Sequence, residues 1–142
     1  MIAPPTEDDW HSEPWGLDAK AAYERFNGKT LEQAVSMIAA DALNREEDLM
    51  FMPAICFRYY LPAYLQYLMS GASQRDSDGA SCVFGLIDHR HDDIVGDAIL
   101  LRNVVRTIAH VGDRQSWYDA DKSIYGSFRG KADRILRKLQ SS

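Results

Sequence analysis

The segment DHRHDD, residues 88–93, concentrates the side chains best suited to chemistry in this chain. Imidazole and carboxylate groups bind divalent metals and activate water in hydrolases. In a helix, Asp88 would lie one turn before Asp92 on the same face. His89 would lie one turn before Asp93 in the same way. Each pair could supply two ligands, so the segment predicts at most half of a metal site.

The dipeptide His91-Asp92 resembles the His-Asp step of the HD-type metal-dependent phosphohydrolases. That family requires a further His upstream and an Asp downstream, and the sequence has no clear counterpart for the His. Asp97 is a guess for the Asp. A solvated helix start is the simpler interpretation, because acidic side chains near a helix N-terminus interact well with the helix dipole. We therefore predict no metal ligand and no catalytic residue here, and keep an HD-type hydrolase centred on His91 and Asp92 as the alternative.

The common catalytic motifs are missing from the sequence: it has no GxSxG, no Gly-rich phosphate loop and no HExxH. Cys56 and Cys82 stand 26 positions apart without CxxC spacing, which is typical of free thiols in a reducing compartment rather than of a zinc site. His11 and His110 are isolated. The prediction is a protein without enzyme activity and without a cofactor.

The most apolar segment is FMPAICFRYYLPAYLQYLMS, residues 51–70. Arg58 interrupts it, which leaves a run shorter than the roughly 18–20 apolar residues of a membrane span. Apolar side chains occur almost all round the expected helix, a pattern typical of a central helix covered by others. Pro62 predicts either a kink or two short helices, the second starting near Leu61. The residues expected in the core are Tyr60, Tyr64, Leu65 and Leu68.

Amphipathic patterns on both sides of this segment predict the covering helices. Thr30 and Gln33 form a capping-box pattern at the start of one of them. The expected helices cover residues 17–26, 31–43, 82–91, 92–112 and 123–139, and residues 70–81 are expected to form an exposed loop. For residues 82–91 a strand is the alternative, because their apolar run shows no period. The sequence thus predicts a single all-α domain over 17–142, a bundle of about five to seven helices around a central Pro-interrupted helix.

Residues 1–16 form an acidic segment that holds Trp10, Trp15 and three prolines, and it is expected to be too Pro-rich for a helix. We predict that its two indoles pack on the domain as a cap, because exposed Trp lowers solubility; docking onto a partner is the alternative. The segment has neither the basic nor the apolar region of a signal peptide, which predicts a cytoplasmic protein.

Charge is unevenly distributed along the chain. Residues 1–50 carry 11 acidic and 4 basic side chains, whereas residues 101–142 carry 4 acidic and 9 basic ones. The bases of the expected last helix are Arg129, Lys131, Arg134, Arg137 and Lys138. They make a nucleic-acid-associated regulator a second alternative, although a pI near 5.3 disfavours it. The acidic surplus favours a basic protein partner, because complementary charge raises the association rate.

The segment AICFRYYLPAYLQYL, residues 54–68, follows GKTLEQA at 28–34 and the acidic stretch REEDLMFMP at 45–53. Together they resemble an uncharacterised family of small bacterial proteins with an aromatic-Leu-Pro-Ala motif after an acidic linker. The resemblance covers about residues 26–69. It implies a shared fold more than a shared activity, because the motif consists mostly of core residues.

Small acidic cytoplasmic proteins of this kind also resemble, by type, the immunity proteins that neutralise toxins of neighbouring bacteria. The prediction is a stoichiometric binding protein whose partner is a protein toxin with a basic cleft, with no membrane partner and no nucleic acid. Two acidic runs near helix boundaries, neither expected to be needed for the core, are the predicted contact residues. They are Glu46, Glu47 and Asp48 in the first run and Asp88, Asp92, Asp93 and Asp97 in the second.

Overall fold

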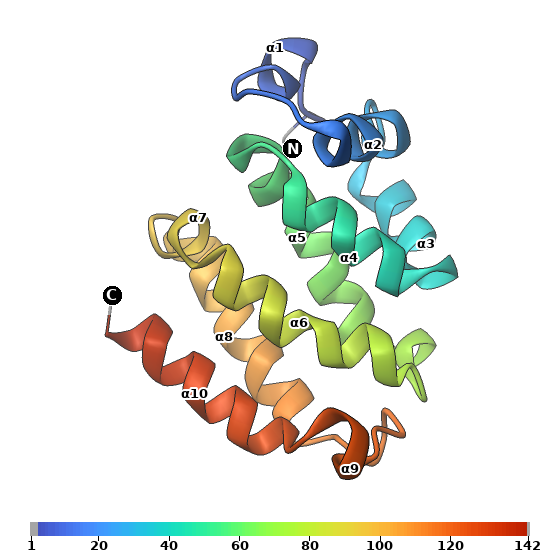
Figure 1. The fold of residues 1–142 in the computed structure, drawn as a ribbon, viewed down its shortest axis with the longest axis vertical. Helices are drawn as coiled ribbons and strands as arrows, with labels where there is room; N and C mark the ends of the chain where they lie inside the picture. Colours follow the sequence, from blue (N-terminus) through green and yellow to red (C-terminus); the bar gives the residue numbers. More distant parts are fainter. Residues whose placement is uncertain (1–2, 142) are drawn as a thin grey trace.

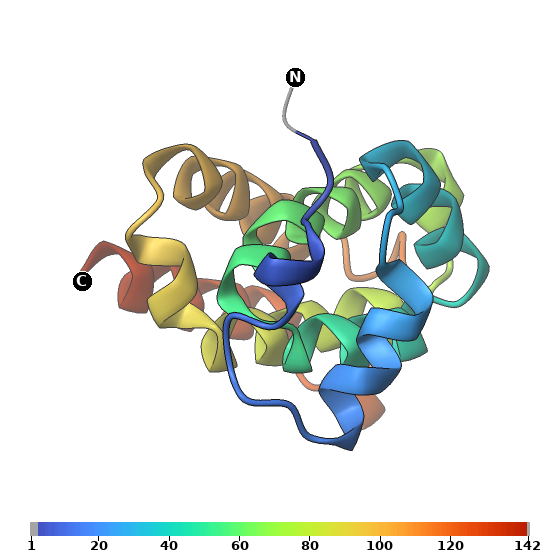
Figure 2. The same ribbon diagram turned by 90° about the horizontal axis from the view of Figure 1, so that it is seen from above.

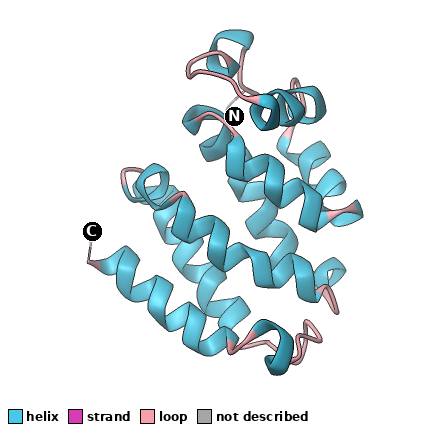
Figure 3. Ribbon diagram, viewed as in Figure 1, coloured by secondary structure: helices cyan, strands magenta, loops and turns pink. Residues whose placement is uncertain are grey.

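A computed structural model describes residues 3–141 and shows an all-α protein (Figure 1, Figure 3). Within these residues there are ten α-helices and one 3-10 turn, and no strand. The elements are α1 (Glu7–Trp10), α2 (Leu17–Phe26), α3 (Leu31–Ala40), α4 (Ala42–Phe51), α5 (Ala54–Met69), η1 (Gly71–Ser73, the 3-10 turn), α6 (Ser77–His89), α7 (His91–Val95), α8 (Ala98–Gly112), α9 (Lys122–Tyr125) and α10 (Phe128–Gln140). The predicted class is confirmed, but the expected number of helices was too low.

Helix α5 is the centre of the molecule and packs against α1, α3, α4, α7 and α8. Tyr60, Tyr64 and Leu68 are completely buried, and Leu65 is nearly so, which confirms the predicted core. Among residues 3–141, no helix is both long enough and apolar enough to cross a bilayer.

Pro62 lies inside α5, and the helix continues through it without a break. Of the two outcomes expected for Pro62, the structure therefore excludes two short helices with the second starting near Leu61, and the kink stays a prediction. Proline removes the N–H that would bond to the carbonyl of Arg58 and costs about 3 kcal/mol in a free helix. Burial of Leu61 and Ala63 on either side of it favours the helix through tertiary packing.

Aspartate caps explain two of the additional helices. Asp41 ends α3 and caps α4, where its Oδ1 accepts from the Asn44 amide at 3.4 Å. Asp97 caps α8 through the Leu100 amide at 3.1 Å. The expected helices over 31–43 and 92–112 are each split at these residues, because a capping Asp adopts a non-helical conformation. Leu43, in the first turn of α4, is half exposed.

The predicted loop over 70–81 is shorter than expected. The turn η1 occupies its first part, and α6 already begins at Ser77, capped by Asp76 through the Gly79 amide at 3.0 Å. The helical interpretation of residues 82–91 is confirmed up to His89, where α6 ends. A Ser- and Asp-rich sequence is thus compatible with a helix start as well as with a loop.

Helices α6, α8 and α10 lie side by side and form the second half of the molecule (Figure 1). Gly112 at the end of α8 allows α10 to approach closely, because a Cβ there would lie only 2.5 Å from the Cβ of Ala132. Gly126, with φ of +72°, separates the short α9 from α10. The single helix expected over 123–139 is therefore two helices.

The N-terminal segment crosses α5 (Figure 2) and caps the core. Trp10 is completely buried, and the Trp15 indole donates to the Trp10 carbonyl at 2.6 Å. Glu13 accepts from the Ala54 amide at 2.7 Å and so caps α5. The predicted intramolecular cap is confirmed, whereas the expectation of no helix before Leu17 is wrong, since α1 forms there with a capping box at Thr6.

Candidate functional site: an acidic corner between α7 and α8

The first acidic run, residues 46–48, lies on α4 rather than in a linker. Asp48 is only 3% exposed, and its two oxygens each accept one bond of 2.8 Å from the Arg25 guanidinium on α2. The Nε atom of Arg45 lies 3.0 Å from the same carboxylate. This ion pair, buried on the Asp48 side, joins α2 to α4, so the expectation that the first run is not needed for the core is wrong for Asp48.

Glu46 is also buried, and burial raises the pKa of its carboxyl group to about 7, with a smaller contribution from Glu47. A charged form would lack the solvation that it has in the unfolded chain. Glu47, between the two buried acids, is exposed. Helix periodicity therefore leaves Glu47 as the member of this run that a partner can reach.

The second acidic run is divided among three elements. Asp88 lies on α6 and pairs with Lys138 of α10, with Nζ and Oδ1 2.6 Å apart. The hydrogen bond from Lys138 holds the pKa of Asp88 below its usual value. Asp92 and Asp93 begin α7, and Asp97 caps α8. Asp88 thus helps to hold α10 on α6, whereas Asp92, Asp93 and Asp97 lie on α7 and at the start of α8.

Arg90, between α6 and α7, is a buried contact centre that the sequence analysis missed. Its Nη1 donates to the carbonyls of Leu49, Met50 and Met52, at 3.2, 3.1 and 2.7 Å. It thereby binds carbonyls at the C-terminal end of α4, where backbone partners within the helix run out; the Leu49 carbonyl also accepts from the Met52 amide at 3.4 Å. Its guanidinium carbon also lies 4.3 Å from the centre of the Phe57 ring. The sequence around Arg90 gives no sign of these contacts, because their partners lie far from it along the chain.

Asp93 holds this arginine in place. Its Oδ2 accepts from the Arg90 Nε at 2.7 Å, and its Oδ1 lies 3.8 Å from Nη1 of Arg58. A charge reversal at Asp93 would therefore also weaken the fold. The expectation that the second run is independent of the core is wrong for this residue.

The open part of the second run forms a depression at the junction of α7 and α8, with a volume of about 610 Å³. We call it the acidic corner. The residues that line it are Arg58, Asp92, Asp93, Gly96, Asp97, Ala98 and Ile99. Three carboxylates face one guanidinium, so the corner carries a formal charge of about −2 at neutral pH.

Asp92 and Ile99 are two strongly exposed residues of this corner. The Asp92 side chain is fully exposed, with its Oδ1 3.1 Å from Nδ1 of His91, and Ile99 is 78% exposed. An isoleucine so exposed beside carboxylates offers an apolar contact together with charge. The sequence analysis missed Ile99, although its place off the helix face that buries Leu100, Val104 and Ile108 is a signal for it.

The residues expected to form half of a metal site do not lie on one continuous helix. The chain leaves the helix at Arg90, so the pairs Asp88 with Asp92 and His89 with Asp93 lie on different elements. In the part of the chain that the structure describes, no group of three or more His, Cys, Asp or Glu side chains is placed to hold a metal ion. Both cysteines are free thiols.

The aromatic-Leu-Pro-Ala motif serves packing. The Tyr60 hydroxyl donates to the carbonyls of Phe26 and Lys29, at 2.8 and 2.7 Å, and the Tyr64 hydroxyl donates to that of Gly79 at 2.6 Å. These bonds connect α5 to the end of α2 and to α6. Comparisons with models of protein families, with curated proteins and with solved structures found no match.

Proposed function

We propose that this protein is a stoichiometric binding protein that uses the acidic corner to hold a basic protein partner. The observation that carries the proposal is that the exposed Asp92 and Ile99 line one depression together with two further carboxylates. Opposite charge steers a basic partner to the corner, and the exposed apolar side chain of Ile99 is removed from water on contact.

The narrower proposal is that the partner is a bacterial toxin. Its support is the type of the protein: a small acidic helical domain of 142 residues with a net charge of −5. Toxins that act on nucleic acids or nucleotides need a cationic cleft for their substrate. An acidic surface that enters such a cleft would both speed association and occupy the substrate site.

The geometry supports a narrower choice of contact acids. The proposed contacts are Asp92, Asp97 and Ile99, because Asp93 is engaged by Arg58 and Arg90. Asp88 is engaged by Lys138. Of the acids in the first run, Glu47 alone is exposed, and it belongs to α4, outside the corner.

The test is a capture experiment on cells of the source organism with the tagged full-length chain. Wild-type protein should retain one basic protein in a 1:1 complex. Expression of the wild-type protein should also protect cells against the toxicity of that captured protein. Asp92→Lys should lose both properties. Glu47→Lys is the matched control, since it makes the same charge change at an exposed acid outside the corner. Capture that survives Asp92→Lys, or that Glu47→Lys abolishes equally, would exclude the acidic corner as the interface.

A further inference from the structure

A mostly apolar groove lies where the N-terminal segment meets the start of α3 and the middle of α5. It has a volume of about 770 Å³, and its lining includes Pro4, Leu31, Glu32, Tyr59 and Pro62. These residues come from three separate segments, of which α3 and α5 pack against each other. The volume falls within the range of about 300–1,000 Å³ that binding pockets occupy. We call it the α5 groove.

Pro62 leaves one backbone acceptor of α5 without its usual donor at this groove. In an α-helix the carbonyl of Arg58 would accept from the amide of residue 62, but proline has no N–H. Among the described residues, no backbone amide from outside α5 takes that place. Arg58 and Pro62 both line the groove, so this carbonyl lies on the groove side of α5. An occupant that donates an N–H would supply the missing bond.

The apolar walls of the groove are held from behind. The Tyr59 ring packs edge-on against the buried Tyr60 ring, with 4.8 Å between the ring centres. Leu31 is the first residue of α3, whose start is fixed by the capping box of Thr30 and Gln33. Leu31 and Tyr59 are only partly buried. The groove therefore offers apolar surface on a preorganised frame, which lowers the cost of binding.

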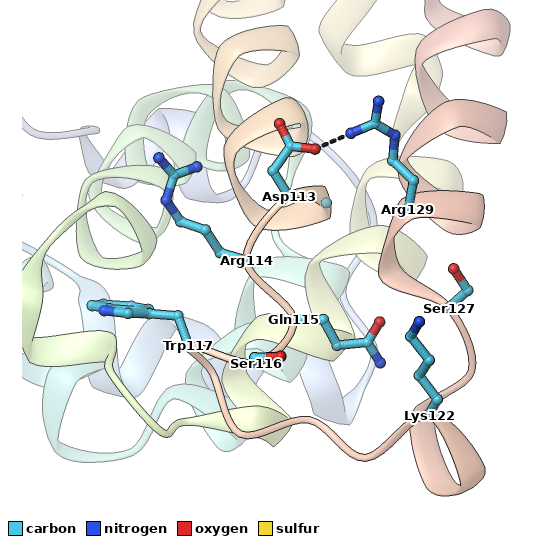
Figure 4. A pocket seen from close by; sticks show the side chains of 9 residues that line it. Asp113, Arg114, Gln115, Ser116, Trp117, Lys122, Ser127 and Arg129 are labelled. Atoms are coloured by element: carbon cyan, nitrogen blue, oxygen red, sulfur yellow. Dashed lines mark hydrogen bonds and ion pairs between the residues drawn. The ribbon is translucent and has the colours of Figure 1, made fainter.

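The hollow at the C-terminal end of α8 differs from the α5 groove (Figure 4). It has a volume of about 400 Å³ and a largely charged and polar lining. Its Arg114 and Trp117 side chains are directed away from the groups on the α10 side. Arg129 is paired with both Asp113 and Asp133. The side chains of this hollow therefore do not converge on one ligand, whereas those of the α5 groove line a common apolar space.

The α5 groove is continuous with the acidic corner through Arg58, which lines both depressions. The acidic corner contributes Asp92, Asp93 and Asp97, and the groove contributes the exposed Glu32. Four carboxylates and one guanidinium give the two depressions a formal charge of about −3 at neutral pH. A segment that reaches from one depression to the other therefore gains from positive charge.

We propose that the α5 groove takes an apolar side chain of the same basic partner that the acidic corner attracts. This inference rests on the proposed function and names the chemistry of the contacting segment: an apolar side chain flanked by lysine or arginine. The apolar side chain leaves water against Leu31, Tyr59 and Pro62, and an N–H of the segment donates to the Arg58 carbonyl. The acidic corner then governs the association rate, and the groove governs the dissociation rate.

The test is the binding kinetics of the full chain with the purified partner captured through the acidic corner. Leu31→Ser removes an apolar wall of the groove and should raise the dissociation rate about tenfold, with the association rate changed by less than about twofold. Leu17→Ser is the matched control, because Leu17 is also the first residue of a helix, is 86% exposed and lies outside the groove. Leu17→Ser should leave both rates unchanged.

Pro62→Ala keeps the test decisive if Leu31→Ser does not fold. It returns an N–H to the middle of α5, so the free energy of unfolding should be unchanged or higher. The Arg58 carbonyl then accepts from the new amide, and the groove loses the proline ring, so the dissociation rate should still rise. If Pro62 matters to the fold alone, Pro62→Ala shifts the unfolding curve and leaves the dissociation rate unchanged.

The outcomes separate the groove from the acidic corner. Wild-type dissociation rates for both Leu31→Ser and Pro62→Ala would overturn the groove, and slower association of Asp92→Lys in the same experiment would leave the acidic corner in place. Faster dissociation of Leu17→Ser to the same extent as Leu31→Ser would also overturn the groove. If no basic partner is captured, both proposals fall.

Discussion

The two acidic runs look alike in the sequence and differ in what their carboxylates contact. On α4, Asp48 faces inward and is bound by arginines of two helices, and Glu46 is buried without that compensation. At the acidic corner, Asp92 faces solvent, and Asp97 caps a helix at the surface. A buried carboxylate affects the stability of the fold, whereas an exposed carboxylate is available to bind a partner. The position of the residue around the helix axis determines which of the two applies.

The largest expected effect is on Asp48. Asp48→Asn leaves Arg45 and the inner side of Arg25 without their counter-charge, so the free energy of unfolding should fall by about 3 kcal/mol, the lower end of the range for breaking a buried pair. The low end applies because Arg25 is 42% exposed and keeps part of its hydration. Denaturant unfolding measures it. Glu47→Gln, at the neighbouring exposed acid, should change the free energy of unfolding by less than about 0.5 kcal/mol. Equal losses for Asp48→Asn and Glu47→Gln would contradict the distinction between a stabilising and an exposed acid in this run.

Glu46 should give the protein a pH dependence. Its pKa is about 7 in the folded state against 4.5 as the ordinary value, so the folded protein binds this proton more tightly than the unfolded chain does. The contribution of Glu46 to stability is thus present below pH 4.5 and is lost as the pH rises to about 7. Glu46→Gln should raise the free energy of unfolding by about 2–3 kcal/mol at pH 8 and hardly change it at pH 4. A pH-independent effect of the substitution would contradict the burial of this acid.

Asp93 and Asp92 are adjacent in one helical turn, yet Asp93 stabilises the fold and Asp92 faces solvent. Asp93→Asn weakens the bond that orients Arg90, which in turn holds the end of α4, and should cost about 2 kcal/mol. Asp92→Asn should cost less than about 0.5 kcal/mol, because its side chain is fully exposed. Thermal or denaturant unfolding of the two variants measures the difference. Comparable losses would show that both acids belong to the fold.

Asp97 has the smallest expected effect among the structural acids. Asp97→Ala removes the acceptor for the Leu100 amide and should lower the free energy of unfolding by about 1 kcal/mol, the usual value of a helix cap. Asp97→Ser keeps a capping side chain without the charge and should restore most of that stability, again by denaturant unfolding. If Asp97→Ser does not restore the free energy of unfolding, then the charge of Asp97, rather than its capping hydrogen bond, stabilises the helix.

Local patterns predicted the parts of the fold that local interactions determine. The capping box at Thr30 and Gln33 forms as expected, with the two backbone bonds at 2.9 and 3.1 Å. The central helix and its buried tyrosines were also evident, because apolar residues surround that helix on all sides. The splits at Asp41 and Asp97 were not predicted, since an Asp between apolar residues fits a helix surface as well as a cap.

The candidate site was less predictable because it depends on contacts between distant segments. Arg90 bonds to carbonyls about forty positions earlier, and Asp48 bonds to Arg25 on another helix. No spacing within the sequence encodes either pair. The sequence identified the acids near helix boundaries, and only the three-dimensional packing separates those that stabilise the fold from those that face solvent.

The rate of association with the captured partner tests the central claim most directly. Binding kinetics at low and high ionic strength should be compared for the wild type, Asp92→Lys and Glu47→Lys. The account predicts that Asp92→Lys slows association at least about tenfold at low salt, that this difference shrinks at high salt, and that Glu47→Lys stays close to the wild type. Equal association rates for all three proteins, with folding intact, would contradict the assignment of the acidic corner as the binding surface.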